Sequence, residues 1–105
     1  MYRQGDILIF PANELPDNLV KVQRTKRGIV LAEGEATGHA HCILNRDVEL
    51  FRQADMDEMA DRFLRVESEA QLVHDEHDTL TIPAGDWVVR HQREYAPAAP
   101  DYVAD

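Results

Sequence analysis

The sequence predicts a small all-β domain, and three of its features support this prediction. Apolar residues occur in short runs of the length typical of strands. Turn-forming residues separate these runs at the spacing expected of a sandwich or barrel. The chain has 105 residues, 44% of them hydrophobic, which is enough for one buried core. We therefore expect a small antiparallel β-barrel or sandwich with at most one short helix.

The first half of the chain is expected to form five strands. Pro11, Asn13 and Pro16 end the first of them, because proline lacks a backbone donor and asparagine favours turns. Residues 33–38 contain two glycines and are expected to form a loop. The predicted strands cover residues 3–10, 19–24, 29–32, 39–44 and 48–53.

One short segment has the pattern of a helix. Met56, Met59 and Phe63 are spaced three and four residues apart, as in a buried helical stripe. Asp55 and Glu58 are placed to form an N-terminal capping pair. This pattern predicts one or two helical turns over residues 55–62.

The rest of the chain is expected to return to strands and then to end in a tail. Pro83-Ala84-Gly85 should form the turn before the last strand. Prolines among alanines mark residues 97–105 as an extended tail, so residues 1–96 are expected to form a single β domain. Strands are predicted over residues 63–66, 71–74, 80–82 and 86–95. The predicted core consists of Ile7, Ile9, Leu31, Leu64, Val66, Leu80, Ile82 and Trp87.

The composition limits the classes of partner. There are 20 acidic and 11 basic residues, which gives a net charge of −9. Binding to nucleic acids or anionic membranes depends on lysine and arginine, so neither is expected, and a small molecule or a protein is the expected partner. A lone cysteine, Cys42, cannot form an internal disulfide, and no apolar run resembles a signal peptide. We therefore expect a soluble cytoplasmic protein.

The strongest chemical signal is a set of four histidines in two motifs, TGHAH and HDEH. On a strand, His39 and His41 point to the same face, one pleat apart, so both imidazoles can reach one divalent ion. His74 and His77 flank a turn and could converge on the same point. Neutral imidazole suits zinc, iron, nickel or copper. The divalent cofactor expected is zinc, iron, nickel or manganese.

Another interpretation of these residues stays open. Ala40, Cys42 and Leu44 form an apolar face opposite His39 and His41, and if that face is the core, both histidines face solvent. Cys42 has histidine neighbours that could activate a thiolate. However, strand alternation points its side chain away from His41, which favours a buried structural cysteine.

Three further residues are candidates for contacting a ligand or cofactor. Glu35 could complete or orient the histidine site. Arg93 and Tyr95 share one face of the last predicted strand with Trp87 and could bind an anionic group. The alternative, an ordinary ion pair or hydrogen bond at the sheet edge, is favoured for Arg93 and Tyr95.

Part of the chain resembles cupins, small β-barrels that hold a metal with an H-x-H pair and further ligands from a second motif. His39-Ala40-His41 and residues 82–86 (IPAGD) carry this resemblance, which implies a cupin-like barrel with a metal site. Asn45 and Arg46 stand where cupins have a glutamate, and Val88 stands where they have a histidine. The resemblance therefore leaves the ligand set incomplete.

A wider resemblance covers nearly the whole chain. Its segments are RQGD, LAEGE, TGHAH, HDEH and QREY, which begin at residues 3, 31, 37, 74 and 92. Together they resemble a group of small, uncharacterised bacterial proteins. This resemblance implies that the segments act together, and it implies no particular activity.

These observations lead to one functional hypothesis and one alternative. The hypothesis is a divalent-metal or small-ligand site formed by His39, His41, His74 and His77, with its catalytic role left open. The alternative is a non-catalytic interaction module whose acidic surface binds a basic protein partner. The metal content of untagged protein distinguishes the two.

Overall fold

Strands account for all regular secondary structure in the described part of the chain. The computed structural model describes residues 1–33, 38–57 and 59–92, and the backbone of residues 102–104. None of these residues is helical, so none belongs to a helix that could cross a membrane. The all-β prediction is confirmed. The strands are β1 (Tyr2–Gln4), β2 (Ile7–Pro11), β3 (Leu19–Lys21), β4 (Ile29–Glu33), β5 (Ala40–Ile43), β6 (Val48–Gln53), β7 (Arg62–Val73), β8 (Leu80–His91) and β9 (Tyr102–Ala104).

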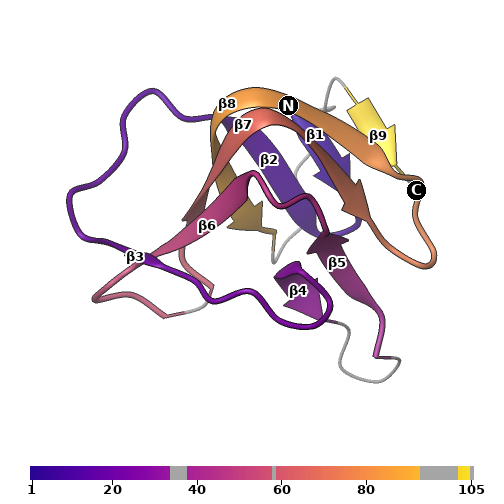
Figure 1. Cartoon of the computed structure of the whole chain (residues 1–105), viewed down its shortest axis with the longest axis horizontal. Helices are drawn as coiled ribbons and strands as arrows, with labels where there is room; N and C mark the ends of the chain where they lie inside the picture. Colours follow the sequence, from indigo (N-terminus) through magenta and orange to yellow (C-terminus); the bar gives the residue numbers. More distant parts are fainter. Residues whose placement is uncertain (34–37, 58, 93–101, 105) are drawn as a thin grey trace.

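The nine strands form one sheet (Figure 1). Its main path runs in the order β3-β6-β7-β8-β2-β1-β9. β5 pairs with the same edge of β7 as β6 does, and β4 pairs with β5. The β1–β9 pair is parallel, whereas the other pairs are antiparallel. Among the described strands, β3, β4 and β9 each have one neighbour, so the sheet does not close into a barrel.

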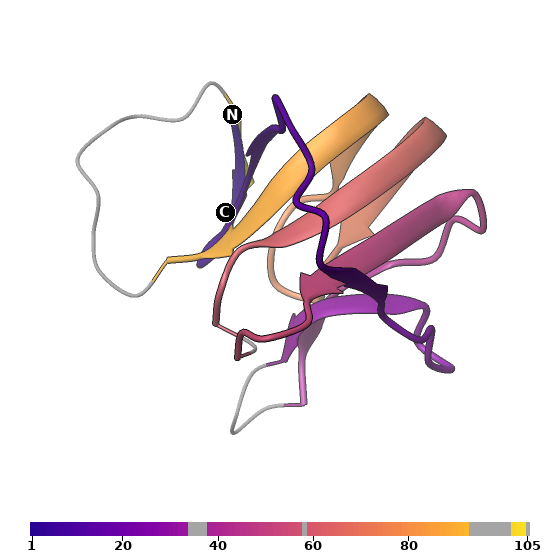
Figure 2. The same ribbon diagram turned by 90° about the vertical axis from the view of Figure 1, so that its left-hand side faces the viewer.

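β7 and β8 are long strands that bend together and divide the sheet into two parts (Figure 2). One extra residue in β7 shifts the register between Val66 and Glu69, whose partners in β8 are Gly85 and Pro83. A bulge of this kind bends a strand and increases its twist. β6 pairs with residues 63–66 of β7, before the bulge, and β5 pairs with residues 72–73, after it. The bulge therefore positions β5 beside the last residues of β7.

This bend accounts for two errors in the predicted strand boundaries. The strands predicted over residues 63–66 and 71–74 are two parts of one strand, β7. The turn predicted at Pro83-Ala84-Gly85 is wrong, because these residues continue β8 across the bend. Proline is tolerated there because β2 pairs only with residues 87–91, which leaves β8 with a single neighbour at Pro83 among the described strands.

At the start of the chain, two strands were predicted as one. The single strand predicted over residues 3–10 is instead part of an antiparallel hairpin of β1 and β2. Gly5 lies in the turn with a φ of 57°, a left-handed conformation that glycine adopts at little cost. This turn brings Gln4 and Gly5 to the same end of the sheet as the HDEH motif.

The helix predicted over residues 55–62 is wrong for the described residues of that segment, which leave out Glu58. Met56 and Ala60 donate backbone hydrogen bonds to residues three positions earlier, as in isolated turns. The Asp57 carboxylate accepts the Met59 amide at 2.9 Å, a local bond that competes with helix formation. Met56 is 55% exposed, so the expected buried stripe does not form.

The predicted core is confirmed. All eight of its residues belong to one buried cluster, which lies between the two parts of the bent sheet and packs residues from both. The other members of the cluster are Ile29, Ile43, Val48, Leu50, Ala70, Leu72 and Val89. β9 lies inside the predicted tail, where it pairs with β1.

Candidate metal centre

The two histidine motifs meet because β5 pairs with the end of β7. The register pairs Cys42 with Val73, and its continuation by one residue places His41 opposite His74. Opposed residues in an antiparallel pair point to the same face, so their side chains are neighbours. The rings of His41 and His74 lie 4.4 Å apart between centroids.

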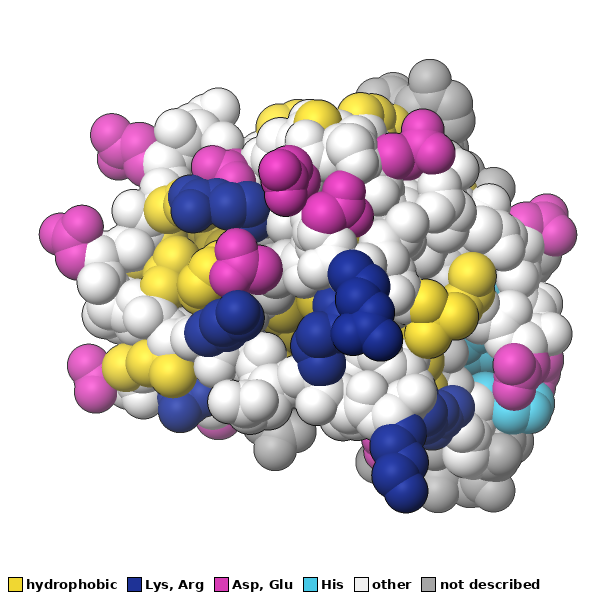
Figure 3. All heavy atoms as spheres, in the orientation of Figure 1, with side chains coloured by type: hydrophobic (Ala, Val, Ile, Leu, Met, Phe, Trp, Pro, Cys, Tyr) yellow, Lys and Arg dark blue, Asp and Glu magenta, His cyan; other side chains and the backbone are white. Residues whose placement is uncertain are grey.

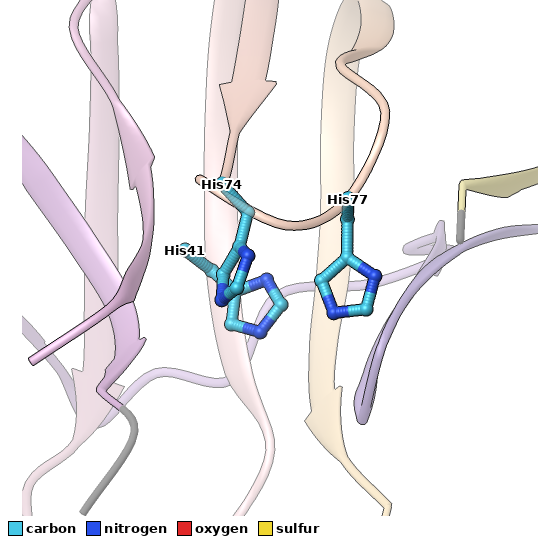
Figure 4. A group of neighbouring side chains, drawn as sticks. All are labelled: His41, His74 and His77. Atoms are coloured by element: carbon cyan, nitrogen blue, oxygen red, sulfur yellow. The ribbon is translucent and has the colours of Figure 1, made fainter. Parts of the chain in front are cut away.

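His77 completes a group of three imidazoles. It lies in the turn that joins β7 to β8, and its ring centroid is 4.5 Å from that of His74 and 5.7 Å from that of His41. Figure 4 shows the three side chains gathered between β5 and this turn. One ring nitrogen from each lies within 4.8 Å of the others. We call His41, His74 and His77 the histidine trio.

Gln4, the last residue of β1, connects His41 to the residues on either side of the other two histidines. Its side chain is fully buried, and its amide nitrogen Nε2 donates to the carbonyl oxygens of Leu72 at 3.0 Å and Asp78 at 2.9 Å. These two donations orient the amide, so its oxygen Oε1 faces Nδ1 of His41 at 2.8 Å. An amide oxygen can only accept, so the Nδ1 of His41 carries the proton. Its Nε2 therefore has a free lone pair, as a metal ligand requires.

His77 has a nitrogen with no hydrogen-bond partner among the described residues. This atom is its Nδ1, which is buried. Buried polar atoms almost always have a partner, so an atom of this kind indicates a missing one. Its Nε2 lies against Gly5, where an added Cβ atom would approach it to 2.9 Å and would lie 3.2 Å from Cε1 of His41. Glycine at position 5 thus lets two imidazoles pack against the β1–β2 turn, because any side chain there would crowd them.

Burial keeps two members of the trio neutral. Burial first, and then the nearby His74 and His77, lower the pKa of His41 from 6.5 to about 4, while Asp6 acts in the opposite direction. The pKa of His74 is lowered by burial, and then by His77 and His39. At neutral pH both imidazoles are therefore unprotonated, which is the form that binds metal ions.

His39 lies beside the trio and not within it. It precedes β5, and its Nδ1 is 2.6 Å from the carboxylate of Glu76 in the β7–β8 turn. Its Nε2 is 3.6 Å from the carboxylate of Asp75, and its ring meets that of His74 edge-on at 5.8 Å. His39 thus contacts a member of the trio while it pairs with acidic side chains of the turn.

The solvent-facing interpretation of the histidine face is wrong for His41. This side chain is only 8% exposed, and Ile43 on the same face is fully buried in the core. On the opposite face Ala40 and Cys42 are buried as well, whereas Leu44, which follows the strand, is 61% exposed. Cys42 is buried, as expected, and burial raises the pKa of its thiol.

Three predicted site residues lie outside the described part of the chain, and two residues of the site were not predicted. The three are Glu35, Arg93 and Tyr95. Gln4 and Gly5 belong to the RQGD segment, whose functional meaning the sequence did not reveal. A polar residue at the end of a strand and a glycine before an aspartate are common in hairpins, so only the contacts with the trio give Gln4 and Gly5 a role.

Comparison with known proteins gives a family and no activity. No curated protein and no solved structure matches the chain. A family model described as a domain of unknown function, DUF8820, matches residues 3–92. This agrees with the expected likeness to a group of small uncharacterised proteins, and the matching family is not that of the cupins. The matched range includes Gln4, Gly5 and the whole trio, and the chain belongs to the DUF8820 family.

Proposed function

We propose that this protein binds a divalent transition-metal ion through His41, His74 and His77. The observation that carries the proposal is the convergence of three ring nitrogens within 4.8 Å. In a tetrahedral zinc site with bonds of about 2.0–2.1 Å, neighbouring ligand nitrogens are separated by roughly 3.3 Å. Small rotations of the three side chains would bridge that difference.

The chemistry of the surrounding residues supports the same proposal. His41 is neutral and presents Nε2 because Gln4 binds its other nitrogen. Metal-binding histidines usually donate their second nitrogen to an oxygen in this way. The buried Nδ1 of His77 has no partner among the described residues, and Nε2 is not crowded because residue 5 has no side chain. A bound cation would satisfy one of these nitrogens.

The donor set also indicates the class of metal. Three imidazole ligands favour zinc, nickel, iron, cobalt or copper, whereas magnesium and calcium require oxygen ligands. Three protein ligands leave a fourth position for water or a small ligand, the arrangement found in catalytic zinc sites rather than in closed structural ones. In this proposal His39 supports the site from outside and is not a ligand.

The test is a thermal denaturation series on untagged, chelator-treated protein with zinc, nickel, cobalt, iron or manganese. A ligand that binds only the folded form stabilises it by about 2.7 kcal/mol at a hundred times its Kd. We expect at least one of these metals to raise the Tm, and we expect His41→Ala, His74→Ala and His77→Ala each to remove the effect. His91→Ala is the matched control, because it deletes a histidine outside the trio.

His39→Ala distinguishes the three-histidine site from the four-histidine site that the motifs suggest. If His39 is not a ligand, this variant keeps most of the metal-induced increase in Tm. If the increase disappears, His39 is a ligand and the site is a closed one. If no metal changes the Tm of the unmodified protein, the proposal is wrong and the interaction-module alternative is favoured.

A further inference from the structure

One hydrogen bond inside the HDEH motif is incompatible with metal binding by His74. The backbone amide of Glu76 donates to Nδ1 of His74 at 3.0 Å. A neutral imidazole has one nitrogen that carries a proton and one that carries a lone pair. Since Nδ1 accepts a hydrogen bond, its lone pair is already engaged, and the ring proton is on Nε2.

Neither nitrogen of His74 can bind a cation while this hydrogen bond persists. If the ion binds Nδ1, it takes the lone pair that the Glu76 amide occupies. If the ion binds Nε2, the ring proton must move through solvent to Nδ1, where it faces the N–H of Glu76, so two donors oppose each other. His41 differs, because its Nδ1 donates to Gln4 and its Nε2 is already available.

We propose that metal binding at the trio releases the Glu76 amide from His74 and reorganises the turn around Asp75 and Glu76. This inference rests on the proposed function and adds a conformational response to it. The response is confined to the turn because Gln4 holds both of its flanks, through the carbonyl oxygens of Leu72 at 3.0 Å and Asp78 at 2.9 Å.

The response reaches the surface through His39. The carboxylates of Glu76 and Asp75 lie 2.6 Å and 3.6 Å from the two ring nitrogens of His39, so a change in the turn alters both contacts. The side chains of His39, Asp75 and Glu76 are 31%, 69% and 62% exposed. Figure 3 shows histidine side chains next to acidic ones on one side of the molecule. Metal occupancy would thus change the charge pattern of this acidic surface.

The test is amide hydrogen exchange, measured by NMR on the full chain with and without zinc. Metal binding normally slows exchange, because it stabilises the folded form. We expect the Glu76 amide to behave in the opposite way and to exchange about threefold to tenfold faster in the zinc-bound protein, because it has lost its acceptor. The Gln71 amide is the matched control, since it also donates to a side chain, that of Asn45 at 2.9 Å. Its exchange should stay constant or slow down.

The outcomes separate this inference from the proposed function. If zinc raises the Tm while the Glu76 amide exchanges at the same rate or more slowly, zinc binds but the turn does not respond, and the inference is wrong. If zinc does not change the Tm, the proposed function fails and the inference fails with it. The ¹⁵N shifts of the His74 ring give an independent check, because Nε2 should carry the proton in the metal-free protein.

Discussion

The carboxamide of Gln4 determines the state of His41. It is fully buried and makes one hydrogen bond with each of three segments, namely β5, the end of β7 and the β7–β8 turn. Because both amide protons go to carbonyl oxygens, the amide cannot reverse its orientation without losing two of these bonds. Gln4 therefore links the position of the turn to the tautomer of a proposed ligand.

Replacing Gln4 by methionine tests this role, since the volume is similar and the hydrogen bonds are lost. Three polar groups would each lose a hydrogen-bond partner, so we expect the free energy of unfolding to fall by about 2–4 kcal/mol. We also expect zinc affinity to fall roughly 10–100-fold, as for other residues that orient metal ligands. Calorimetric titration with zinc measures the second effect.

Gln53→Met is the matched control, because the side-chain amide of Gln53 donates to the Asp61 carbonyl at 2.9 Å, outside the site. It should bind zinc like the unmodified protein. Unchanged zinc affinity in Gln4→Met would mean that the orientation of His41 does not depend on Gln4.

Glycine is favoured at position 5 both by its backbone conformation and by the lack of room for a side chain. Two alanine variants distinguish these effects. The backbone at Gly5 has a φ of 57°, which disfavours residues with a side chain. A Cβ atom at this position would also crowd His77 and His41. Gly38 has a φ of 71°, and no atom of the described residues lies within 4 Å of an added Cβ atom there. Alanine at either position should cost about 1–2 kcal/mol of stability from the left-handed backbone. Only Gly5→Ala should also abolish the zinc-induced increase in Tm, and equal loss in both variants would contradict the steric argument.

His41 makes the metal-free protein sensitive to acid. Its pKa is about 4 in the folded protein, against 6.5 for an unperturbed histidine, and its side chain is only 8% exposed. Between these two values the unfolded chain binds more protons than the folded one, so stability falls as the pH falls. The two pKa values differ by about 2.5 pH units, and each unit corresponds to about 1.4 kcal/mol. The free energy of unfolding should therefore fall by roughly 3 kcal/mol as His41 becomes protonated.

Urea denaturation of the chelator-treated protein between pH 7 and pH 4 measures this effect. The unmodified protein should lose more stability over this range than His41→Gln, which cannot take up the proton. Since carboxylates titrate in both proteins, the difference between the two curves reports His41. Parallel curves would show that burial does not lower its pKa.

At the scale of the elements, the sequence predicted where strands occur better than where they end. Short apolar runs located parts of β2, β4, β5 and β6, because a buried strand needs apolar side chains wherever it lies. The continuous β7 and β8 were each divided in the prediction. Pro83 and Gly85 usually mark turns, but here they lie at a bulge where β8 has one neighbour among the described strands. Which neighbour a strand has is a tertiary property that local patterns do not contain.

The bend between β7 and β8 depends on the core that it encloses. Ile82 is fully buried and lies opposite Ala70, next to the bulge. Ile82→Ala should lower the free energy of unfolding by about 2–5 kcal/mol, because it leaves a cavity in a close-packed interior. Leu44→Ala is the control, since Leu44 is 61% exposed and its loss should change stability by less than about 0.5 kcal/mol. Similar values for the two variants in urea denaturation would mean that the core is placed wrongly.

At the scale of the whole molecule, the site depends on contacts between distant parts of the sequence. The sequence identified the histidine motifs, since four such residues in so short a chain are unusual. It did not separate His39 from the trio, because strand alternation puts His39 and His41 on one face. The β7–β8 turn separates them. It places Asp75 and Glu76 against His39, and it places His77 against Gly5. The roles of Gln4 and Gly5 likewise arise only in the folded protein, where the end of β1 lies next to the β7–β8 turn.

Zinc K-edge X-ray absorption of the zinc-loaded protein tests the proposed site most directly, because it reports the atoms bound to the ion. We predict a first shell of nitrogen and oxygen only, at about 2.0–2.1 Å, with the outer-shell scattering of three imidazoles. His91→Ala should give the same spectrum, and His77→Ala should lose one imidazole or the bound zinc. A shell of oxygen alone, or sulfur at about 2.3 Å from Cys42, would contradict a site formed by His41, His74 and His77.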